Sequence, residues 1–502
     1  MTTAVHTNLR AVIDIGSNSI RLVIFEDGQQ FKRVVHESDA CGLGRGLSTT
    51  GMLNPDGKAE ALRLMQRFAA ILRQHGVANK QTYVIATEAV RRAKDGENFI
   101  RAVNKQTGLK IQTISGEREG YLSAYGVACG FAAPHGIVGD MGGGSFELVA
   151  IKGDKIGKRI SLPFGPLPLL DSKNSLAEIR KSVREELKRY KWLKSAGRDK
   201  TFYAVGGIFR SLARIYKHEH KDPLDSVHGF ALDANIWQRY LRGGKTKLWT
   251  NAARSAGVRA DRVDKIPVVL TVLDEVFDYV GFDRIKFSEY GLREGVLATE
   301  RGLKPAPELL VQACSAVAAR YRRTIGPKPG VDAQQVYDFI APVCTKIGLT
   351  KRQRLLAQAA CALMDIGWVM RPPDRAVNLL REIAEEPFPQ ASQHDRMLIA
   401  LMIFARYGGK TGEVPFDLKK FTSQEIKMTQ VIGHALRLAD TLCLGASSML
   451  SHLRLDVTRQ VLSLDLPRSM PIAGGADVPT RLERLADSLG VTALTQQKIL
   501  RR

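Results

Sequence analysis

The chain has 502 residues, of which 44% are hydrophobic and 25% are charged, so it is long and apolar enough to bury several cores rather than one. Its six cysteines have no paired spacing, which argues against a disulfide framework or a zinc site and favours a reducing compartment. The formal net charge of +23 is unusual for a soluble enzyme and implies a polyanionic partner: nucleic acid, an anionic membrane or a phosphate polymer.

The N-terminal segment MTTAVHTNLR has neither the charged start nor the apolar core of a signal peptide. The sequence that follows contains no apolar run of the roughly 18 residues that a transmembrane helix needs. We therefore expect a soluble, cytoplasmic protein that has no membrane partner.

A strand predicted at 11–15 leads into DIGSNSIRLVIFEDG, residues 14–28, and its pattern returns 126 positions later in GDMGGGSFELV, residues 139–149. The matching positions are Asp14 with Asp140, Gly16 with Gly142, Ser19 with Ser145, Leu22 with Leu148 and Val23 with Val149. In each copy an acidic residue follows a predicted strand and precedes a predicted turn of small residues and a predicted hairpin. The hairpin turns are expected at Asp27-Gly28 and at Gly153-Asp154. The repeat predicts two similar domains that each present one phosphate loop.

The second copy places three glycines between two strands. Glycine is costly inside regular structure, so this run marks a tight turn or a close approach of the backbone to another group. Three neighbouring N–H groups released from a ladder form a concavity for anionic oxygens, and Asp140 would hold a divalent cation opposite them. For one loop alone, an ordinary glycine-rich hairpin turn is the alternative, and the repeat argues against it.

Strands and helices alternate up to about residue 300, as in layered α/β folds. After the first strand, strands are predicted at 82–86, 137–140 and 201–205, and helices are predicted to begin near Pro55, Thr87, Glu117, Leu176 and Ile208.

Basic residues are concentrated in one part of this α/β region. Residues 151–250 hold 22 basic and 10 acidic residues, a net +12, within totals of +15 for 1–304 and +8 for 305–502. The richest segment, 178–200, has helical apolar spacing with basic residues around it. A solvated helix face is the usual meaning of such a segment, and a track for a polyanion is the alternative.

The proline-rich KPAPE, residues 304–308, marks a domain boundary, after which the sequence is mostly helical. Helices are predicted within 308–323, 333–348, 351–370, 395–409 and 425–447, and a short hairpin near 453–466. The predicted parts of the chain are 1–126, 127–304, 305–412 and 413–502.

The two loops, with a Gly-Gly that opens a helix in AVGGIFRSLARIY at 204–216, resemble those of the actin-like, sugar-kinase and heat-shock ATPase superfamily. More narrowly, the chain resembles the exopolyphosphatase and guanosine pentaphosphate phosphohydrolase family. The motifs that carry this resemblance, in the family's order, are DIGSNSIRLVI, ATEAVRRA at 86–93, ISGEREGYLSAYGV at 114–127, GDMGGGSFELV and YGLREGVL at 290–297. It implies two actin-like (ribonuclease H-like) α/β domains with a cleft between them, then a mostly helical HD-like region that often mediates a homodimer.

The helical region raises the question of a second, HD-type metal site. Where that chemistry needs a His-Asp pair, this chain has LMD at 363–365, with no histidine to bind metal. His394-Asp395 lies where a helix begins, and Asp395 fits a capping role as well as a ligand role. His218 and His220 have no obvious third ligand, so we expect surface residues there.

The resemblance places the family's catalytic glutamate at Glu119, as general base, and a second functional acid at Glu147, which orients water or metal. Glu117 is close in sequence but does not fit the register of the motif. We expect Mg²⁺ to be held by Asp14, Asp140 and Glu147. The residues expected to bind phosphate are Ser17, Asn18, Ser19, Arg21, Arg91, Gly142, Gly143, Gly144 and Ser145. Arg293 is either a further clamp or a structural residue.

The resemblance implies an exopolyphosphatase that removes the terminal phosphate of inorganic polyphosphate with the help of magnesium. Hydrolysis of guanosine pentaphosphate at the same site is the close alternative, and an actin-like or sugar-kinase-like ATPase is a more distant one. Nucleic acid is a poor candidate partner because no nucleic-acid motif is present and aromatic residues are only 7% of the chain.

Overall fold

The computed structural model describes residues 9–26, 31–243, 246–321, 331–467 and 477–498. The chain divides into two compact units, Met1–Ala306 and Pro307–Arg502, and the KPAPE segment spans this division. No helix among the described residues is long and apolar enough to cross a membrane.

The first unit contains two sheets of the same topology, with strand orders β3-β2-β1-β4-β5 and β10-β11-β9-β6-β7-β8. The strands of the first sheet are β1 (Leu9–Ile15), β2 (Ser19–Glu26), β3 (Arg33–Ala40), β4 (Thr82–Ala86) and β5 (Ile111–Thr113). Those of the second are β6 (His135–Met141), β7 (Phe146–Lys152), β8 (Lys155–Leu162), β9 (Thr201–Val205), β10 (Ala231–Asp233) and β11 (Arg284–Phe287). Starting from β3 in the first sheet and from β8 in the second, each sheet has two antiparallel pairings followed by two parallel ones. β10 is an additional antiparallel strand at the opposite edge of the second sheet. The predicted actin-like fold of two repeated α/β domains is confirmed.

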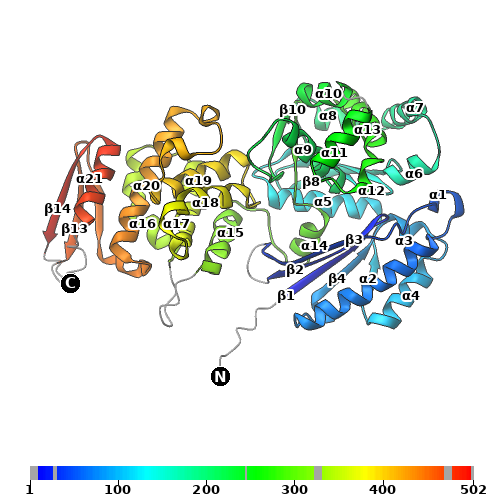
Figure 1. The fold of residues 1–502 in the computed structure, drawn as a ribbon, viewed down its shortest axis with the longest axis horizontal. Coiled ribbons are helices and arrows are strands. Elements are labelled where there is room, and N and C mark those ends of the chain that lie inside the picture. Colours follow the sequence, from blue (N-terminus) through cyan, green and yellow to red (C-terminus); the bar gives the residue numbers. More distant parts are fainter. Residues whose placement is uncertain (1–8, 27–30, 244–245, 322–330, 468–476, 499–502) are drawn as a thin grey trace. The chain divides into compact units, whose positions relative to one another are not determined.

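Helices cover the faces of these sheets, as Figure 1 shows. Those of the first sheet are α1 (Leu47–Thr50), α2 (Pro55–Gln74), α3 (Glu88–Arg92) and α4 (Gly96–Thr107). The second sheet is followed or covered by α6 (Pro166–Asp171), α7 (Leu176–Leu187), α8 (Trp192–Gly197), α9 (Gly207–Glu219), α10 (Ala234–Gly243), α11 (Thr246–Ser255), α12 (Ala260–Val263) and α13 (Ile266–Val280). One buried core joins the first sheet to α2 and α4 through Met65, Phe68 and Phe99.

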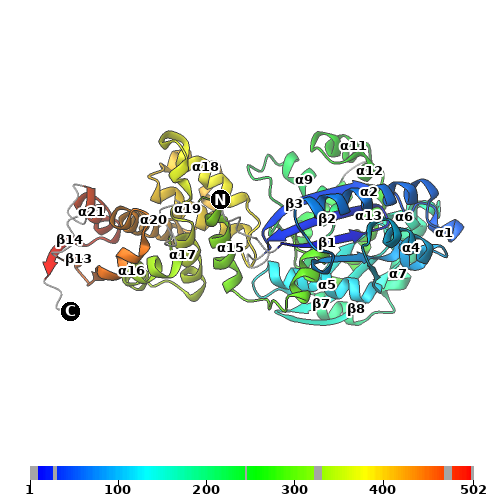
Figure 2. The ribbon, with the colours of Figure 1, turned by 90° about the horizontal axis from the view of Figure 1, so that it is seen from below.

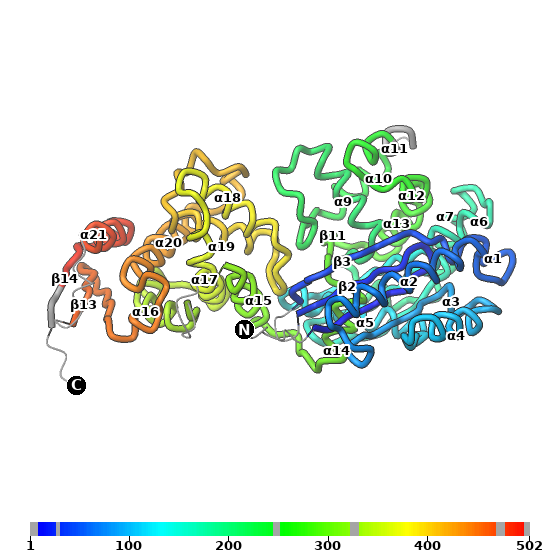
Figure 3. The backbone as a smooth tube through the Cα atoms, turned by 60° about the horizontal axis from the view of Figure 1, so that its bottom comes forward, coloured from blue at the N-terminus to red at the C-terminus, as the bar shows by residue number. Residues whose placement is uncertain are grey.

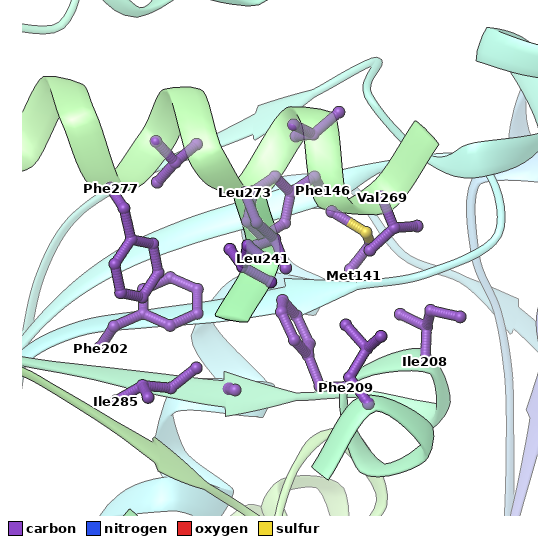
Figure 4. Close-up of a cluster of buried hydrophobic side chains, with 14 of the residues drawn as sticks. Met141, Phe146, Phe202, Ile208, Phe209, Leu241, Val269, Leu273, Phe277 and Ile285 are labelled. Carbon is purple, nitrogen blue, oxygen red and sulfur yellow. The ribbon is translucent and has the colours of Figure 1, made fainter. Parts of the chain in front are cut away.

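The second sheet packs against α9 and α13 through a core rich in aromatic side chains (Figure 4). Phe202 of β9 lies at its centre, with ring centroids 5.8 Å from Phe209 and 5.3 Å from Phe277. Burial of such large apolar side chains is the main stabilising term of a fold, and here it fixes β6 and β9, whose ends carry the site described below.

Two helices connect the two domains: α5 (Gly116–Gly130), which packs on β7 and β8, and α14 (Leu292–Glu300), which also contacts β1. Figure 2 shows α5 beside these strands. The helices meet through glycine: a Cβ at Gly126 would lie 2.2 Å from the carbonyl oxygen of Gly291, and one at Gly295 would lie 1.8 Å from that of Leu122. No side chain separates the two backbones at this crossing.

Most predicted elements of the first unit are found close to their predicted positions. The turn at Gly153-Asp154 is confirmed, with φ of +64° at Gly153, whereas Asp27-Gly28 lies outside the described residues. The prediction of one helix over 178–200 is wrong, because the chain leaves α7 at Leu187 and begins α8 at Trp192. The predicted border at 126/127 falls inside α5, which runs unbroken from one domain to the next.

The second unit is mostly helical, as predicted, and its chain can be followed in Figure 3. Its helices are α15 (Glu308–Ala318), α16 (Ala333–Lys346), α17 (Lys351–Leu363), α18 (Pro372–Glu385), α19 (Gln393–Arg406), α20 (Ser423–Cys443) and α21 (Asp477–Leu489). The predicted hairpin is β12 (Arg454–Val457) with β13 (Val461–Pro467), and β14 (Thr492–Lys498) extends it in parallel. The division at 412/413 stays a prediction.

Candidate active site

The two repeated loops have the same backbone turn. The N–H of Gly16 donates to the carbonyl of Ser19 at 3.1 Å, and the N–H of Gly142 donates to that of Ser145 at 3.0 Å. One loop follows β1 and the other follows β6, so both lie at the carboxyl ends of equivalent strands. Equivalent turns at equivalent strand ends confirm the repeat that the sequence shows.

Each turn leaves two consecutive N–H groups free. Within the described part of the chain, the backbone N–H groups of Ser17 and Asn18, and of Gly143 and Gly144, have no hydrogen-bond acceptor. All four residues line one cleft, whose water-accessible volume is about 110 Å³. Buried or half-buried N–H groups without a protein partner are costly, so two such pairs directed at a cleft favour an anionic ligand.

The loops approach each other closely, and glycine permits the approach. A Cβ at Gly143 would lie 3.3 Å from the Asn18 backbone nitrogen, and one at Gly144 would lie 1.4 Å from Glu88 Oε2 and 2.9 Å from Ser17 Oγ. Ser17 Oγ itself donates to Glu88 Oε2 at 3.3 Å. Glu88 thus touches both loops and holds the hydroxyl of Ser17.

Besides Glu88, four carboxylates surround these loops: Asp14, Asp140, Glu119 and Glu147, all nine-tenths buried or more. Ser123 Oγ donates to Asp140, and Ser161 Oγ donates to Glu147 Oε1 at 2.7 Å. Two of the other oxygens, Glu119 Oε2 and Glu147 Oε2, are buried and accept no hydrogen bond from the described residues. A buried carboxylate oxygen without a donor pays its desolvation cost in full.

Burial and mutual repulsion raise the pKa values of three of these acids, Glu119, Glu147 and Asp140. For Glu119, burial and then the charges of Glu147, Asp140 and Asp14 raise the pKa well above its ordinary value. Burial and the charge of Asp140 raise the pKa of Glu147 to about 8. The pKa of Asp140 is also raised, chiefly by burial. The acids therefore share a proton near neutral pH unless a cation compensates them.

The cleft gathers most of the residues predicted from the sequence. Its lining includes Asp14, Ser17, Asn18, Ser19, Arg21, Glu119, Asp140, Gly142, Gly143, Gly144 and Ser145. Glu147 is fully buried and lies beneath the lining, where it pairs with Asp140 across β6 and β7. Arg91 is not part of the lining, and its guanidinium donates to the carbonyl of Ile114. Glu117 is exposed and lies 4.0 Å from Arg159.

The structure adds residues that the sequence reasoning missed. Asn18 is held between the domains, since its amide donates to Asp261 Oδ2 at 3.0 Å and accepts from Lys265 Nζ at 2.8 Å. Arg262, in the same segment, donates to the carbonyl of Gly207 at 3.1 Å. Glu88 lies inside the quoted ATEAVRRA motif, so a signal existed for it, whereas the segment around Asp261 carries no recognisable pattern.

The other candidate metal residues have structural roles. Ser392 begins α19 with a capping box in which Asp395 accepts from its backbone and hydroxyl, and Arg352 contacts Asp395 at 2.7 Å. His394 Nε2 lies 2.8 Å from Glu425 Oε1. His220 stacks on Tyr216 with ring centroids 3.9 Å apart.

Among the described residues, the acids close enough to share a metal ion are Asp274, Glu275 and Asp278. Arginines of α7 and α10 neutralise them: Arg180 lies 2.8 Å from Asp274, and Arg242 lies 2.7 Å from Asp274. One carboxylate oxygen from each of these three acids lies within 4.8 Å of the others, whereas those of the predicted ligands Asp14, Asp140 and Glu147 do not form such a group.

Several known proteins resemble this chain. A crystal structure of an exopolyphosphatase from Cytophaga hutchinsonii ATCC 33406 is 24% identical with a TM-score of 0.53, and the match covers 59% of this chain and 99% of that one. A crystal structure of the Aquifex aeolicus member of the Ppx/GppA family is 28% identical with a TM-score of 0.49, over 58% of this chain and 97% of that one. The first match supports the two-domain fold.

A curated relative, the bifunctional 3-dehydroquinate synthase/phosphatase of Fusobacterium nucleatum subsp. nucleatum, is 26% identical over 305 residues, which are 56% of this chain and 45% of the relative. The chain thus spans less than half of that relative's length. Residues 329–495 match the exopolyphosphatase C-terminal domain. Residues 22–302, more than half of the chain, match the Ppx/GppA phosphatase family, and the chain belongs to this family.

Proposed function

We propose that this protein is an exopolyphosphatase, which hydrolyses the terminal phosphoanhydride bond of inorganic polyphosphate and releases orthophosphate. The observation that carries the proposal is the cleft that is lined both by two equivalent loops with free N–H groups and by Glu119, whose Oε2 accepts no hydrogen bond from the described residues. Phosphoryl transfer concentrates negative charge on the transferred group, so positioning and electrostatic stabilisation supply most of the catalysis.

The loops would bind the terminal phosphate. The N–H groups of Ser17, Asn18, Gly143 and Gly144 donate to its oxygens, and the Ser17 hydroxyl is fixed by Glu88. The bond from Asn18 to Asp261 joins the two domains, so it holds both loops at one separation. These contacts orient the phosphorus atom toward an attacking water molecule.

Glu119 would act as the general base. In the proposed step, a water oxygen forms a bond to the terminal phosphorus while the water proton moves to a Glu119 carboxylate oxygen. The bond between that phosphorus and the bridging oxygen breaks, and the shortened chain leaves with the bonding electrons. A carboxylate whose pKa is raised by burial is a stronger base than an ordinary one, and it suits this role when a bound cation keeps it ionised before the step.

The acids also fit Mg²⁺, because two buried carboxylate oxygens have no donor and neighbouring carboxylates repel one another. Asp14, Asp140 and Glu147 would hold the ion, in part through water molecules. When bound, the ion would neutralise charge on the phosphate oxygens and lower the pKa values of the nearby acids.

The decisive experiment measures phosphate release by the purified full-length chain with Mg²⁺, offering long polyphosphate, short polyphosphate, guanosine pentaphosphate and ATP side by side. The proposal requires that polyphosphate is the best substrate. Preference for guanosine pentaphosphate would assign the same site to that phosphohydrolase activity, and turnover of ATP alone would overturn the proposal.

We also propose a cytoplasmic location, which agrees with six free cysteines, and an action without nucleic-acid or membrane partners. The homodimer that the family resemblance implies stays a prediction, and light scattering of the full-length chain measures it directly.

A further inference from the structure

Five arginines line the proposed active-site cleft: Arg21, Arg210, Arg259, Arg262 and Arg293. Arg259 lies 3.1 Å from Asp261, whereas the charges of the other four are poorly neutralised. Arg21 from the first domain and Arg262 from the second approach the same point, since a Cβ at Gly207 would lie 3.5 Å and 2.8 Å from their respective NH2 atoms. Like charges brought this close repel each other, which favours an anion between them.

The partners of these arginines are mostly neutral groups. Arg21 lies 3.4 Å from Asp14 Oδ2, a long ion pair. Arg262 donates to the Gly207 carbonyl and to Ser211 Oγ at 3.0 Å. Arg293 donates to His36 Nε2 at 3.3 Å, and since arginine only donates, that imidazole nitrogen must be an acceptor without a proton. The neutral partners of Arg262 and Arg293 do not offset the positive charge of these arginines.

Arg210 is the least satisfied of the four. It lies one turn into α9 and lines the cleft, yet its guanidinium makes no hydrogen bond or ion pair with any described residue. Burial and the charges of Arg293 and Arg21 lower its pKa to about 9, so it is still protonated at neutral pH. Glu289, an acid of the same cleft, lies 3.8 Å from Arg33 and shares its charge with that residue.

We propose that Arg210 and Arg293, together with Arg21 and Arg262, form a second anion subsite that binds the phosphates next to the terminal one in an unbranched phosphate chain. The proposal rests on the proposed function, because it takes the terminal phosphate to lie between the loops. The shared chemistry is a row of phosphoanhydride oxyanions, which polyphosphate and the 5′ end of guanosine pentaphosphate both supply. Guanidinium groups suit these oxygens because each presents several donors in a fixed plane.

The subsite predicts a difference between orthophosphate and tripolyphosphate. Orthophosphate fills only the loops, whereas tripolyphosphate also reaches the arginines. Losing a hydrogen bond to a charged group costs about 1.5–3 kcal/mol, so Arg210→Met should weaken tripolyphosphate binding roughly tenfold to a hundredfold. Orthophosphate affinity should change less than about threefold, since in this proposal Arg210 lies beyond the phosphate held by the loops and the attraction between charges falls with distance.

The experiment measures calorimetric affinities for tripolyphosphate, orthophosphate and guanosine pentaphosphate in the full-length chain with Mg²⁺. A Glu119→Gln background prevents hydrolysis during the titration. Arg214→Met is the matched control, because Arg214 lies on the same helix but is exposed and does not line the cleft. Arg210→Lys keeps the charge and should lose only part of the affinity.

An equal loss for orthophosphate and tripolyphosphate, or no loss for either, overturns the subsite. If Arg210→Met lowers the melting temperature sharply, Arg210→Lys and Arg293→Lys decide by the same comparison. A loss confined to polyphosphates or to guanosine pentaphosphate identifies which chain the arginines serve. If wild type binds tripolyphosphate but hydrolyses no phosphate chain, the proposed function fails while the subsite stands.

Discussion

Arg21 and Glu147 occupy the same position of the repeated hairpin, each directly across from the aspartate one residue before the end of the preceding strand. Strand pairing sets Arg21 opposite Asp14 in the first domain and Glu147 opposite Asp140 in the second. One copy of the repeat therefore neutralises its aspartate, and the other adds a second carboxylate to it. The duplicated loops are alike in backbone geometry and opposite in local charge.

Replacing Glu119 by glutamine should remove hydrolysis while the fold and substrate binding remain, because the amide keeps the shape but cannot accept a proton. A general base typically contributes about 10² to 10⁴ in rate, so phosphate release should fall by that range. The measurement is turnover with polyphosphate at saturating Mg²⁺, with melting temperature on the same sample. Glu117→Gln is the matched control in the same helical turn, and it should retain nearly full activity. Activity of Glu119→Gln within about tenfold of wild type would assign the base to another residue.

A methyl group at Gly144 should abolish activity, whereas one at Gly142 should be tolerated much better. At Gly144 the new Cβ would overlap Glu88 Oε2, at 1.4 Å, while at Gly142 the closest atom is Ser145 O at 3.7 Å. Gly143→Ala should be intermediate, because its nearest contacts are at 3.3 Å. Turnover and melting temperature are compared for all three variants. Equal activity of Gly142→Ala and Gly144→Ala would contradict the close approach of the loops.

Without divalent cations, the protein should lose stability as the pH rises from the ordinary pKa of a glutamate side chain toward neutrality. Burial raises the pKa of Glu147 from 4.5 to about 8, so between these values the folded state holds a proton that the unfolded state has released. Stability then falls with rising pH, by about 1.4 kcal/mol for each unit of pKa difference.

Thermal unfolding in EDTA and in Mg²⁺, from pH 5 to pH 8, measures this effect. Mg²⁺ should raise the melting temperature most at the upper end of the range, where the acids are otherwise repelling one another. Glu119→Gln should show a shallower fall in EDTA, because one carboxylate is gone. Identical profiles with and without Mg²⁺ would argue against a cation among these acids.

Charge reversal at Lys188 and Lys191 tests the polyanion track predicted from the sequence. Both lysines are exposed, whereas Arg180 and Arg184 of α7 are bound to acids of α13. Lys188→Glu with Lys191→Glu should weaken binding of long polyphosphate more than short, and the difference should vanish at high salt. Exposed charges are screened over about 8 Å at physiological ionic strength.

The control for the charge reversal is Lys105→Glu with Lys110→Glu, an equal change at exposed positions of the first domain. Apparent affinities for long and short polyphosphate are measured at low and high salt in the three proteins. Equal salt slopes and an unchanged length preference would mean that the basic residues serve another partner, and nucleic acid would be tested next.

Asp395→Asn should destabilise the second unit without changing metal content. The substitution weakens the capping box at Ser392 and removes the ion pair with Arg352, changes that together cost about 1–3 kcal/mol. Chemical denaturation measures the loss, and elemental analysis of both proteins measures bound metal. A metal ion lost from Asp395→Asn would restore the HD-type interpretation.

The local repeat in the sequence predicted both loops, because a shared pattern of aspartate, glycine and serine dictates a shared turn. Glu88 and Arg210 escaped prediction for a different reason. Their roles depend on residues far away in the chain. Glu88 contacts Ser17, which is 71 positions away. Arg210 stands out because its guanidinium has no hydrogen bond or ion pair with a described residue, which only the folded structure shows. The single helix predicted at 178–200 failed because apolar spacing does not reveal a break between two helices that bury the same face, such as Leu187 and Leu193.

The contact between α5 and α14 sets how closely the two helices that connect the domains approach each other. At Gly126 and Gly295 the neighbouring atoms belong to backbone rather than to flexible side chains, so no rotamer change relieves an added methyl group. A larger side chain there would force the backbones of α5 and α14 apart, whereas a substitution in a hydrophobic core would leave a cavity. We therefore expect alanine at either glycine to push the two helices apart and so to change the angle between the domains, even though neither residue lines the cleft.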